Sequence, residues 1–290
     1  MKSGLNILIL GGDNRYLEVI NILTSNNMNI FLNGFDKLSF EDPSIHNLET
    51  SEIDFRIMDA ILLPVSGTDK DGEIEATYSN TSIRLTEKQL QQTPDHCTIY
   101  TGISNDFLDK ITHSSNRKMV RLFARNDIAI YNSIPTAEAT LKIAIEETDV
   151  TIHGSEVLVI GFGRVGITVA RLFAALGAKV TVAARKSEHF ARIAEMGLKS
   201  METSRIENIV SNMDICINTV PHSTIDSKVI DQMASSTLII DLASKPGGTD
   251  FDYAKEKGIK AIHALGLPGK TAPRTAGEII GGVLLELIQS

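Results

Sequence analysis

One segment constrains the fold of this chain more than any other. Residues 157–166 are V-L-V-I-G-F-G-R-V-G, an apolar run followed by glycines spaced G-x-G-x-x-G. A helical pattern over 164–176 comes next and ends before Gly177, and a second apolar run begins at Val180. Strand, glycine turn, helix and strand in this order are the context in which such glycines bind a dinucleotide. The segment therefore predicts a parallel α/β domain with a nucleotide site.

Each glycine of the motif has its own physical role. Gly161 allows the tight turn, Gly163 lets the backbone approach a pyrophosphate, and Gly166 lets the helix pack against the strand. The free N–H groups and the dipole at the start of the helix favour an anion. The candidate cofactor residues in this segment are Gly161, Phe162, Gly163, Arg164, Val165 and Gly166.

Basic residues follow the second strand, where an NAD-dependent enzyme usually has Asp or Glu. The segment is Ala184-Arg185-Lys186-Ser187, and the first carboxylate is Glu188. Arg185 can bind a phosphate through two parallel hydrogen bonds, Lys186 adds charge, and we expect Ser187 to cap the next helix and face the same phosphate. These residues predict NADP as the cofactor, although a solvated basic turn would have the same composition.

Two later strand ends are expected to form the walls of the nicotinamide site. They follow the apolar runs 215–218 and 238–241. The candidate residues there are Thr219, Val220, Pro221, Ala243 and Ser244.

Apolar runs alternate with amphipathic stretches along the whole chain, which predicts parallel sheets with crossover helices. We expect two Rossmann-like lobes with a cleft between them: a substrate and partner domain, 1–133, and an NADP-binding domain, 134–290. Pro135 is expected in the first turn of the connecting helix. The C-terminal helix, 275–289, is expected to pack back on the first domain.

The same patterns predict individual elements. In the first domain, strands are expected at 5–10, 30–32, 60–63, 98–100 and 128–131, and helices at 13–26, 104–112 and 116–125. In the second domain, strands are expected at 157–160, 180–183, 215–218, 238–241 and 260–263, and an irregular loop at 264–277.

Small polar residues follow several predicted strands of the first domain, where ligands of parallel sheets bind. Their N–H and O–H donors suit an anionic substrate, and lysines of later loops would add charge. Each cluster is also compatible with an ordinary turn or cap. The candidate substrate-binding residues are Ser66, Gly67, Thr68, Asn132, Ser133, Thr136, Lys245 and Lys270. A fourth turn, Gly11-Gly12-Asp13 with Arg15, begins the first helix.

Composition excludes several classes of protein. The 290 residues are 42% hydrophobic and 22% charged, as in ordinary globular enzymes. No apolar run approaches the roughly 18 residues of a membrane span, and a net charge of −8 argues against nucleic-acid binding. Cys97 and Cys216 are too few for a disulfide framework, which indicates a reducing cytoplasm. No spacing typical of a metal site occurs.

Longer motifs resemble one family. They are G-G-D-x-R, I-L-L-P-V-S, Y-N-S-I-P-T-A-E, G-F-G-R-V-G, D-L-A-S-K-P-G-G-T-D-F and L-P-G-K-T-A-P-x-T-A-G. Together they resemble the A subunits of dipicolinate synthases from spore-forming bacteria, over nearly the whole chain. The resemblance implies NADP-dependent oxidation of dihydrodipicolinate, or its hydrated precursor, to dipicolinate (pyridine-2,6-dicarboxylate). It also implies a partner, the flavoprotein-like B subunit of that enzyme, and the cytoplasm of the mother cell during sporulation as location. We expect self-association as well.

The sequence does not identify the catalytic base, for which Asp13, Glu138 and His263 are candidates by position alone. Two other functions stay open. A 2-hydroxyacid-type or related NADP-dependent dehydrogenase fits the layout, but such enzymes use a His after the last strand, where this chain has none and His263 precedes the loop. The second alternative function is that of a non-catalytic NADP-binding subunit of a complex.

Overall fold

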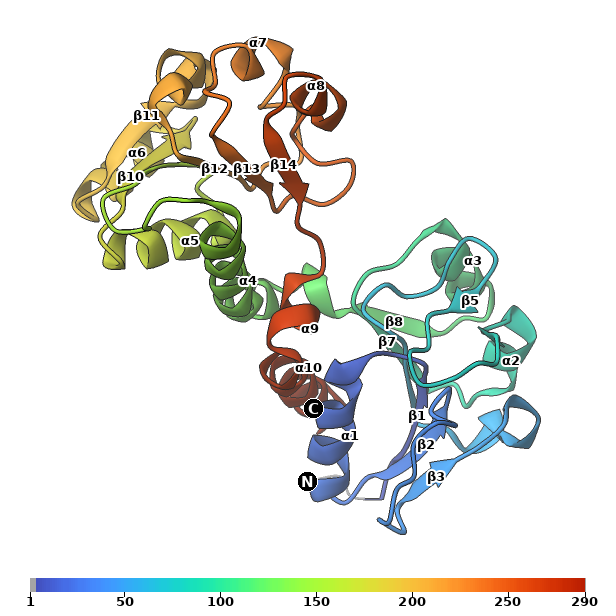
Figure 1. Cartoon of the computed structure of the whole chain (residues 1–290). Helices are drawn as coiled ribbons and strands as arrows, with labels where there is room; N and C mark the ends of the chain where they lie inside the picture. The colour runs from blue at the N-terminus through green and yellow to red at the C-terminus, as the bar shows by residue number, and fades with distance from the viewer. Residues whose placement is uncertain (1–3, 290) are drawn as a thin grey trace. The chain divides into compact units, whose positions relative to one another are not determined.

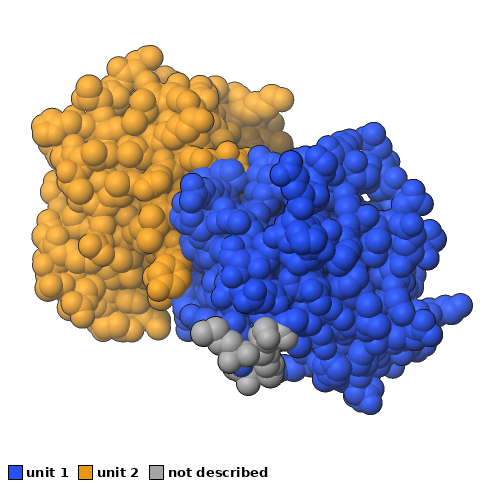
Figure 2. Space-filling view, turned by 90° about the horizontal axis from the view of Figure 1, so that it is seen from below, with its two compact units in different colours: residues 1–129, 272–290 blue, residues 130–271 orange. Residues whose placement is uncertain are grey.

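The computed structural model describes residues 4–289 and contains two compact units (Figures 1 and 2). Unit 1 consists of the chain up to residue 129 and from residue 272 on, and unit 2 of residues 130–271. Within the described residues, each unit has a six-stranded parallel sheet, ordered β3-β2-β1-β4-β7-β8 in unit 1 and β11-β10-β9-β12-β13-β14 in unit 2. The predicted α/β class with two Rossmann-like sheets is confirmed.

Unit 1 combines its sheet with a small hairpin. The sheet strands are β1 (Asn6–Leu10), β2 (Asn29–Asn33), β3 (Ile45–Asn47), β4 (Ala60–Leu62), β7 (Thr98–Thr101) and β8 (Lys118–Arg121). The hairpin strands are β5 (Glu73–Ile74) and β6 (Ile83–Arg84). The helices are α1 (Asn14–Ser25), α2 (Glu87–Gln92), α3 (Asp106–Ser114) and α10 (Pro273–Gln289), with 3₁₀ turns at Thr50–Glu52, Phe55–Ile57 and Leu122–Ala124.

Alternation along β1 divides the core of unit 1 into two layers. Ile7 and Ile9 pack with residues of α1 and α10, whereas Leu8 and Leu10 pack with α2, α3 and the hairpin. All four side chains are buried. Both faces of the sheet are therefore covered by apolar side chains. Burial of each aliphatic side chain stabilises the fold by about 1.5–3 kcal/mol.

Unit 2 repeats the pattern. Its strands are β9 (Glu156–Ile160), β10 (Lys179–Ala184), β11 (Lys199–Glu202), β12 (Ile215–Asn218), β13 (Leu238–Asp241) and β14 (Lys260–His263). Its helices are α4 (Asn126–Glu147, which begins in unit 1), α5 (Arg164–Ala175), α6 (Ser187–Glu195), α7 (Ser227–Ile230), α8 (Phe251–Glu256) and α9 (Leu267–Thr271), with 3₁₀ turns at Thr203–Asn208 and Val210–Asn212. Within residues 4–289, no helix is both long and apolar enough to cross a membrane.

Three predictions for the segment 116–135 are wrong. The strand predicted at 128–131 is wrong because these residues are helical, and the helix predicted at 116–125 is instead β8 and a 3₁₀ turn. A short apolar run fits a buried strand and a buried helix equally well, which explains the error. Pro135 lies inside α4 rather than in its first turn. A proline there removes only one N–H···O bond, and the long helix retains the others.

The irregular loop predicted at 264–277 is also wrong. Helix α9 occupies Leu267–Thr271, and α10 begins at Pro273. Proline is compatible with the first turn of a helix, where its missing N–H has no intrahelical partner. The prolines of this segment therefore mark helix starts, not a loop.

Helix α10 lies along α1, as Figure 1 shows, and glycines allow the close approach. A Cβ atom on Gly277 would lie 2.3 Å from the carbonyl oxygen of Arg15, and one on Gly281 would lie 2.9 Å from Ile22 Cδ1. A Cβ atom on Gly282 would have no neighbouring atom within 4 Å. Gly277 is therefore required by packing, whereas Gly282 is not.

We expect Gly277→Ala to lower the free energy of unfolding by about 1–3 kcal/mol, because its methyl group meets backbone that cannot move independently. The matched variant Gly282→Ala should raise it by about 0.5–1 kcal/mol, since alanine favours the helix. Urea unfolding followed by circular dichroism measures both. Equal effects of the two substitutions would contradict the close packing at Gly277.

Candidate functional site

A hollow of about 490 Å³ lies at the carboxyl ends of β9, β10 and β12 in unit 2. This edge of a parallel sheet is where doubly wound folds bind ligands. The lining residues are Gly161, Phe162, Gly163, Ala183, Ala184, Arg185, Lys186, His189, Thr203, Thr219, Val220, Pro221, His222, Ser223 and Thr224.

The glycine turn at the base of this hollow fits a pyrophosphate. Gly161 has φ +101°, and a Cβ there would lie 2.4 Å from Thr219 Oγ1. A Cβ on Gly166 would lie 2.2 Å from the carbonyl oxygen of Gly161, so only glycine lets α5 approach the turn. Gly163 has no neighbouring atom within 4 Å of its Cβ position, which leaves open space on the side of the hollow. The three glycines thus have the geometry that a dinucleotide requires.

Two buried polar side chains shape the loops beyond the turn. Asn218 accepts hydrogen bonds from Val220 N and Thr224 Oγ1 and donates one to Val220 O. Asp241 accepts from Ala243 N, Gly248 N and Thr249 Oγ1. Both side chains are fully buried, and breaking a buried network of this kind is costly. The loop that begins at Asn218 is therefore fixed as a wall of the hollow.

Basic side chains stand at the end of β10. Arg185 lines the hollow and is exposed, and it forms no ion pair with a residue of 4–289. Lys186 Nζ lies 3.7 Å from Glu188 Oε1, with both side chains exposed. The prediction that Ser187 caps the next helix is wrong, because Ser187 is the first residue of α6 and Lys186 occupies the capping position without a capping hydrogen bond.

A second hollow of about 470 Å³ adjoins the first and shares Arg185, Thr203, Ser223 and Thr224 with it. Thr203 follows β11, an exposed edge strand that the hydrophobic pattern did not reveal. Sequence reasoning also missed His189, whose ring lies 5.5 Å from that of Phe162. Of the residues predicted for the cofactor, six do not line the first hollow: Arg164, Val165, Gly166, Ser187, Ala243 and Ser244.

Unit 1 has a glycine turn at the same topological position, but the chain itself fills it. The Gly12 N–H donates to Glu75 O at 2.9 Å, and the Thr77 N–H donates to Gly12 O at 3.0 Å. A Cβ on Gly11 would lie 2.4 Å from Glu75 O. Backbone therefore occupies the space in unit 1 that corresponds to the open turn at Gly163 in unit 2.

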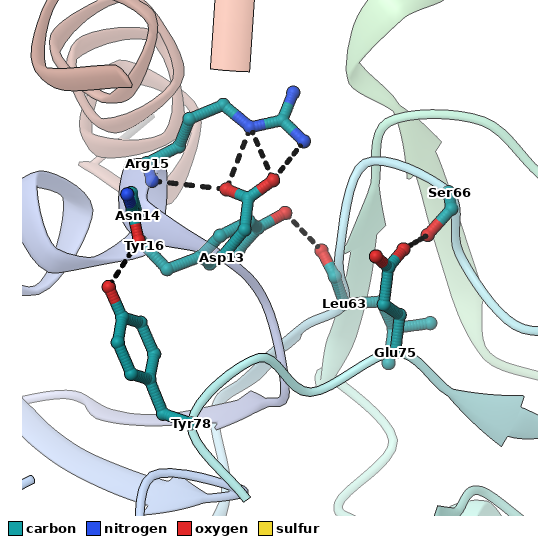
Figure 3. Close-up of polar contacts among 8 residues, drawn as sticks. All are labelled: Asp13, Asn14, Arg15, Tyr16, Leu63, Ser66, Glu75 and Tyr78. Carbon is teal, nitrogen blue, oxygen red and sulfur yellow. Dashed lines mark hydrogen bonds and ion pairs between the residues drawn. The ribbon is translucent and has the colours of Figure 1, made fainter. Parts of the chain in front are cut away.

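The polar side chains around this turn are drawn in Figure 3. Asp13 caps α1 by accepting from Arg15 N, and it binds the Arg15 guanidinium through Nε, at 2.9 Å, and Nη2, at 2.6 Å. Burial alone would lower the pKa of Arg15, but hydrogen bonding to Asp13 and the nearby carboxylates raise it. Tyr16 donates to Leu63 O, and Tyr78 donates to Asn14 Oδ1. These contacts fix the start of α1.

The turn predicted at Ser66, Gly67 and Thr68 exists and lines a hollow of about 370 Å³. Three acidic residues line it too: Asp69, Glu73 and Glu75. Ser66 Oγ donates to Glu75 Oε2 over 3.5 Å. The Thr68 hydroxyl is buried and has no hydrogen-bond partner among the residues that the structure describes.

The second predicted turn does not exist, because Asn132, Ser133 and Thr136 lie on α4. Ser133 is buried, and its hydroxyl contacts Ile130 O and Thr168 Oγ1. Thr136 donates to Asn132 O, four residues earlier in the helix. Both hydroxyl groups therefore have partners on α4 and α5.

The other candidates lie in unit 2. Glu138 is exposed on α4, and Lys245 and Lys270 are exposed in unit 2. His263 Nε2 lies 2.9 Å from Ala243 O, and its ring stacks on Phe251.

The described residues indicate neither a nucleophilic cysteine nor a metal site. Burial raises the pKa of the Cys216 thiol to about 12 and that of Cys97 to about 11, so neither is a nucleophile at neutral pH. Between residues 4 and 289, no group of three or more His, Cys, Asp or Glu side chains is placed to hold a metal ion.

Comparison with known proteins defines the class first. Residues 123–245 match the NAD-binding domain of D-isomer specific 2-hydroxyacid dehydrogenases. The chain therefore contains a dehydrogenase-type domain for a nicotinamide cofactor, which supports an oxidoreductase. D-lactate dehydrogenase of Escherichia coli superposes with a TM-score of 0.62 at 14% identity, over 98% of this chain and 96% of that one, and shows the fold alone.

The family is defined by closer relatives. Residues 6–123 match the N-terminal domain of the dipicolinate synthase A subunit. The A subunit of dipicolinate synthase from Bacillus subtilis (strain 168) is 50% identical over 288 residues, which cover 99% of this chain and 97% of that protein. The crystal structure of the same subunit from Bacillus halodurans superposes with a TM-score of 0.98 at 49% identity, over 100% of this chain and 99% of that one. The chain belongs to the family of dipicolinate synthase A subunits, and the resemblance of its motifs is confirmed.

We expect Gly163→Ala to weaken the binding of NADPH and NADH alike by about tenfold or more, because the added methyl group enters the open space of the turn. The melting temperature should stay near that of the unchanged protein, since no atom lies near the new Cβ. Calorimetric titration and thermal unfolding measure the two effects. Unchanged cofactor affinity would place the pyrophosphate elsewhere.

Proposed function

We propose that this chain is the dehydrogenase subunit of a dipicolinate synthase, acting in the cytoplasm of the mother cell during sporulation. It oxidises dihydrodipicolinate, or its hydrated precursor, to dipicolinate, with NADP as hydride acceptor. Identity of 50% along almost the full length to a protein named for this product supports the reaction. The observation that carries the cofactor assignment is the basic end of β10, where Arg185 and Lys186 line the hollow.

The oxidation removes one hydride and one proton from the ring. Dihydrodipicolinate and NADP⁺ give dipicolinate, NADPH and H⁺, and the hydrated precursor also loses water. The bound nicotinamide supplies the hydride acceptor. The protein mainly has to hold the ring and its two carboxylates in line with the nicotinamide, because formation of the aromatic ring itself favours the product. An alignment task of this kind requires donors for carboxylates more than a strong base.

The preference for NADP follows from charge. A 2′-phosphate brings negative charge next to the adenosine ribose, and a guanidinium binds it with two parallel hydrogen bonds. Arg185 has no carboxylate partner in the described chain, and no acidic residue precedes Glu188 after β10. The segment directly after β10 therefore offers no carboxylate to the ribose hydroxyl groups, although Glu202, Glu207 and Asp226 line the adjoining hollow.

We expect Arg185→Ala to weaken NADPH binding by about 1.5–3 kcal/mol, the contribution of hydrogen bonds to a charged group. NADH binding should change little. Arg192→Ala is the matched control, because Arg192 follows on α6, pairs with Glu195 at 3.0 Å and does not line the hollow. Calorimetric titration of both cofactors into the three proteins is the measurement. Equal losses for NADPH and NADH would contradict a phosphate contact at Arg185.

A partner completes the proposal. The relatives are named by a subunit letter, which implies a complex, and we propose the flavoprotein-like B subunit of the synthase for that role. In a coupled assay, aspartate semialdehyde, pyruvate and dihydrodipicolinate synthase generate the substrate in place. When the mixture contains this chain, NADP and the B subunit, we expect dipicolinate and NADPH to form in equal amounts. In size-exclusion chromatography, we expect the two subunits to elute as one complex.

The same assay separates the alternatives. If this chain were a non-catalytic NADP-binding subunit, its partner would form dipicolinate at an unchanged rate when this chain is withdrawn. A 2-hydroxyacid dehydrogenase would reduce 2-oxo acids with NADPH and form no dipicolinate. Absence of dipicolinate above the spontaneous background, with and without the partner, would overturn the proposed reaction.

A further inference from the structure

Two arginines of unit 1 pair in the same way with an aspartate two residues earlier. In both pairs the aspartate accepts from the arginine N–H, Nε and Nη2. The Arg56 side chain is 77% exposed beside Asp54, whereas the Arg15 side chain is only 14% exposed beside Asp13. The two aspartates are similarly exposed, at 32% for Asp13 and 39% for Asp54, so the difference lies in the guanidinium of Arg15, which loses hydration. A cap alone explains the exposed pair and does not explain the burial of Arg15.

The guanidinium of Arg15 has one edge left for another ligand. Its Nε–Nη2 edge is directed at Asp13 (Figure 3), and Nη1 forms no hydrogen bond within the described chain. A guanidinium has five N–H donors in a rigid plane, and its end edge, Nη1 with Nη2, matches the two oxygens of a carboxylate. Asp13 holds the plane in one orientation, so the free edge is preorganised for a planar anion.

The neighbours of Arg15 define the remaining chemistry. Glu75 lies near enough to Arg15 for its charge to act on the guanidinium, and its carboxylate is exposed beside the Ser66 hydroxyl. The buried Thr68 hydroxyl, in the same turn as Ser66, has no partner among residues 4–289. Buried polar groups without a partner are rare, and a functional role is one explanation for them. A ligand at this edge therefore meets one bidentate donor and one carboxylate acceptor.

We propose that the free edge of Arg15 binds one carboxylate of the substrate, with Asp13 as its positioning residue, and that Glu75 accepts a hydrogen bond from the ring hydroxyl group of the hydrated precursor. The inference rests on the proposed function, from which the substrate class, a reduced nitrogen ring with carboxylates, is taken. The hollow at Ser66, Gly67 and Thr68 is lined by three acidic residues, so we place no carboxylate inside it.

The test uses pyridine-2,6-dicarboxylate as the probe, titrated calorimetrically into the full chain with and without NADPH after divalent cations have been removed. We expect Arg15→Lys to weaken binding by about tenfold, because lysine keeps the charge but loses the planar fork. Arg56→Lys, the same change in the exposed pair, should bind the probe as the unchanged protein does.

Glu75→Gln supplies a result that a structural role would not give. The aromatic probe carries no N–H or O–H group for Glu75 at neutral pH, so the carboxylate only repels it. The variant should therefore bind the probe more tightly, while the KM for the reduced substrate rises in the coupled assay. Melting temperatures and NADPH affinities near those of the unchanged protein confirm that the variants fold.

Each outcome has a defined meaning. Equal affinity of Arg15→Lys and the unchanged protein, or no binding of the probe to the unchanged protein with or without NADPH, overturns the assignment of Arg15. Turnover in the coupled assay under those results leaves the proposed function intact. Probe binding that depends on Arg15 in a protein without turnover supports the assignment and overturns the proposed reaction.

Discussion

The backbone pairing between Gly12 and residues 75–77 decides what unit 1 can bind. Both units have the same strand order and a glycine turn after the central strand. In unit 2 the turn is open at Gly163, whereas in unit 1 Glu75 O accepts from Gly12 N and Thr77 N donates to Gly12 O. A buried N–H that already has a partner offers nothing to a phosphate. One fold therefore gives a nucleotide site in unit 2 and excludes that site from unit 1.

The pairing also changes which groups face a ligand in unit 1. Because the backbone N–H groups of the turn are engaged, a ligand of the site that we propose would be recognised by side chains, and the segment that fills the turn carries Glu75. Arg15 and Glu75 are far apart in the chain, and the charge of Glu75 acts on Arg15 because residues 75–77 pair with Gly12 at the end of β1. A side-chain site of this kind suits a small planar acid better than a flexible dinucleotide, because its donors have fixed directions.

Local patterns predicted the parts of the structure that depend on local physics. The strands 215–218, 238–241 and 260–263 coincide with β12, β13 and β14, because buried parallel strands are continuous apolar runs between polar residues. The turn at Gly161 was also predictable, because the glycine spacing G-x-G-x-x-G between a strand and a helix is typical of this turn. Helix α4 was not, because its apolar start fits either element.

The missed site residues depend on tertiary packing. Thr203 follows an edge strand with no apolar periodicity, and Glu75 lies in a long connection whose position is set by its bonds to Gly12. Ser133 shows the reverse error: its residue type suggested a turn, but the hydroxyl group contacts Thr168 inside a helix pair. Small polar residues serve caps, turns and helix contacts alike, so residue type alone does not separate these roles.

The Arg15–Asp13 pair carries no net charge, and this limits what it can contribute to the binding of a dicarboxylate. A neutral pair gives an anion directed hydrogen bonds rather than long-range attraction, so it favours specificity over affinity. The whole chain is at −8, and the hollow beside Ser66 is acidic. In the proposed site, attraction of a doubly charged acid would therefore come from unpaired cations, whereas Arg15 would select ligands by the plane and spacing of one carboxylate. If the proposed site and reaction hold, such a site rejects anions of the wrong shape without holding the product tightly, which suits the release of a dianion after each turnover.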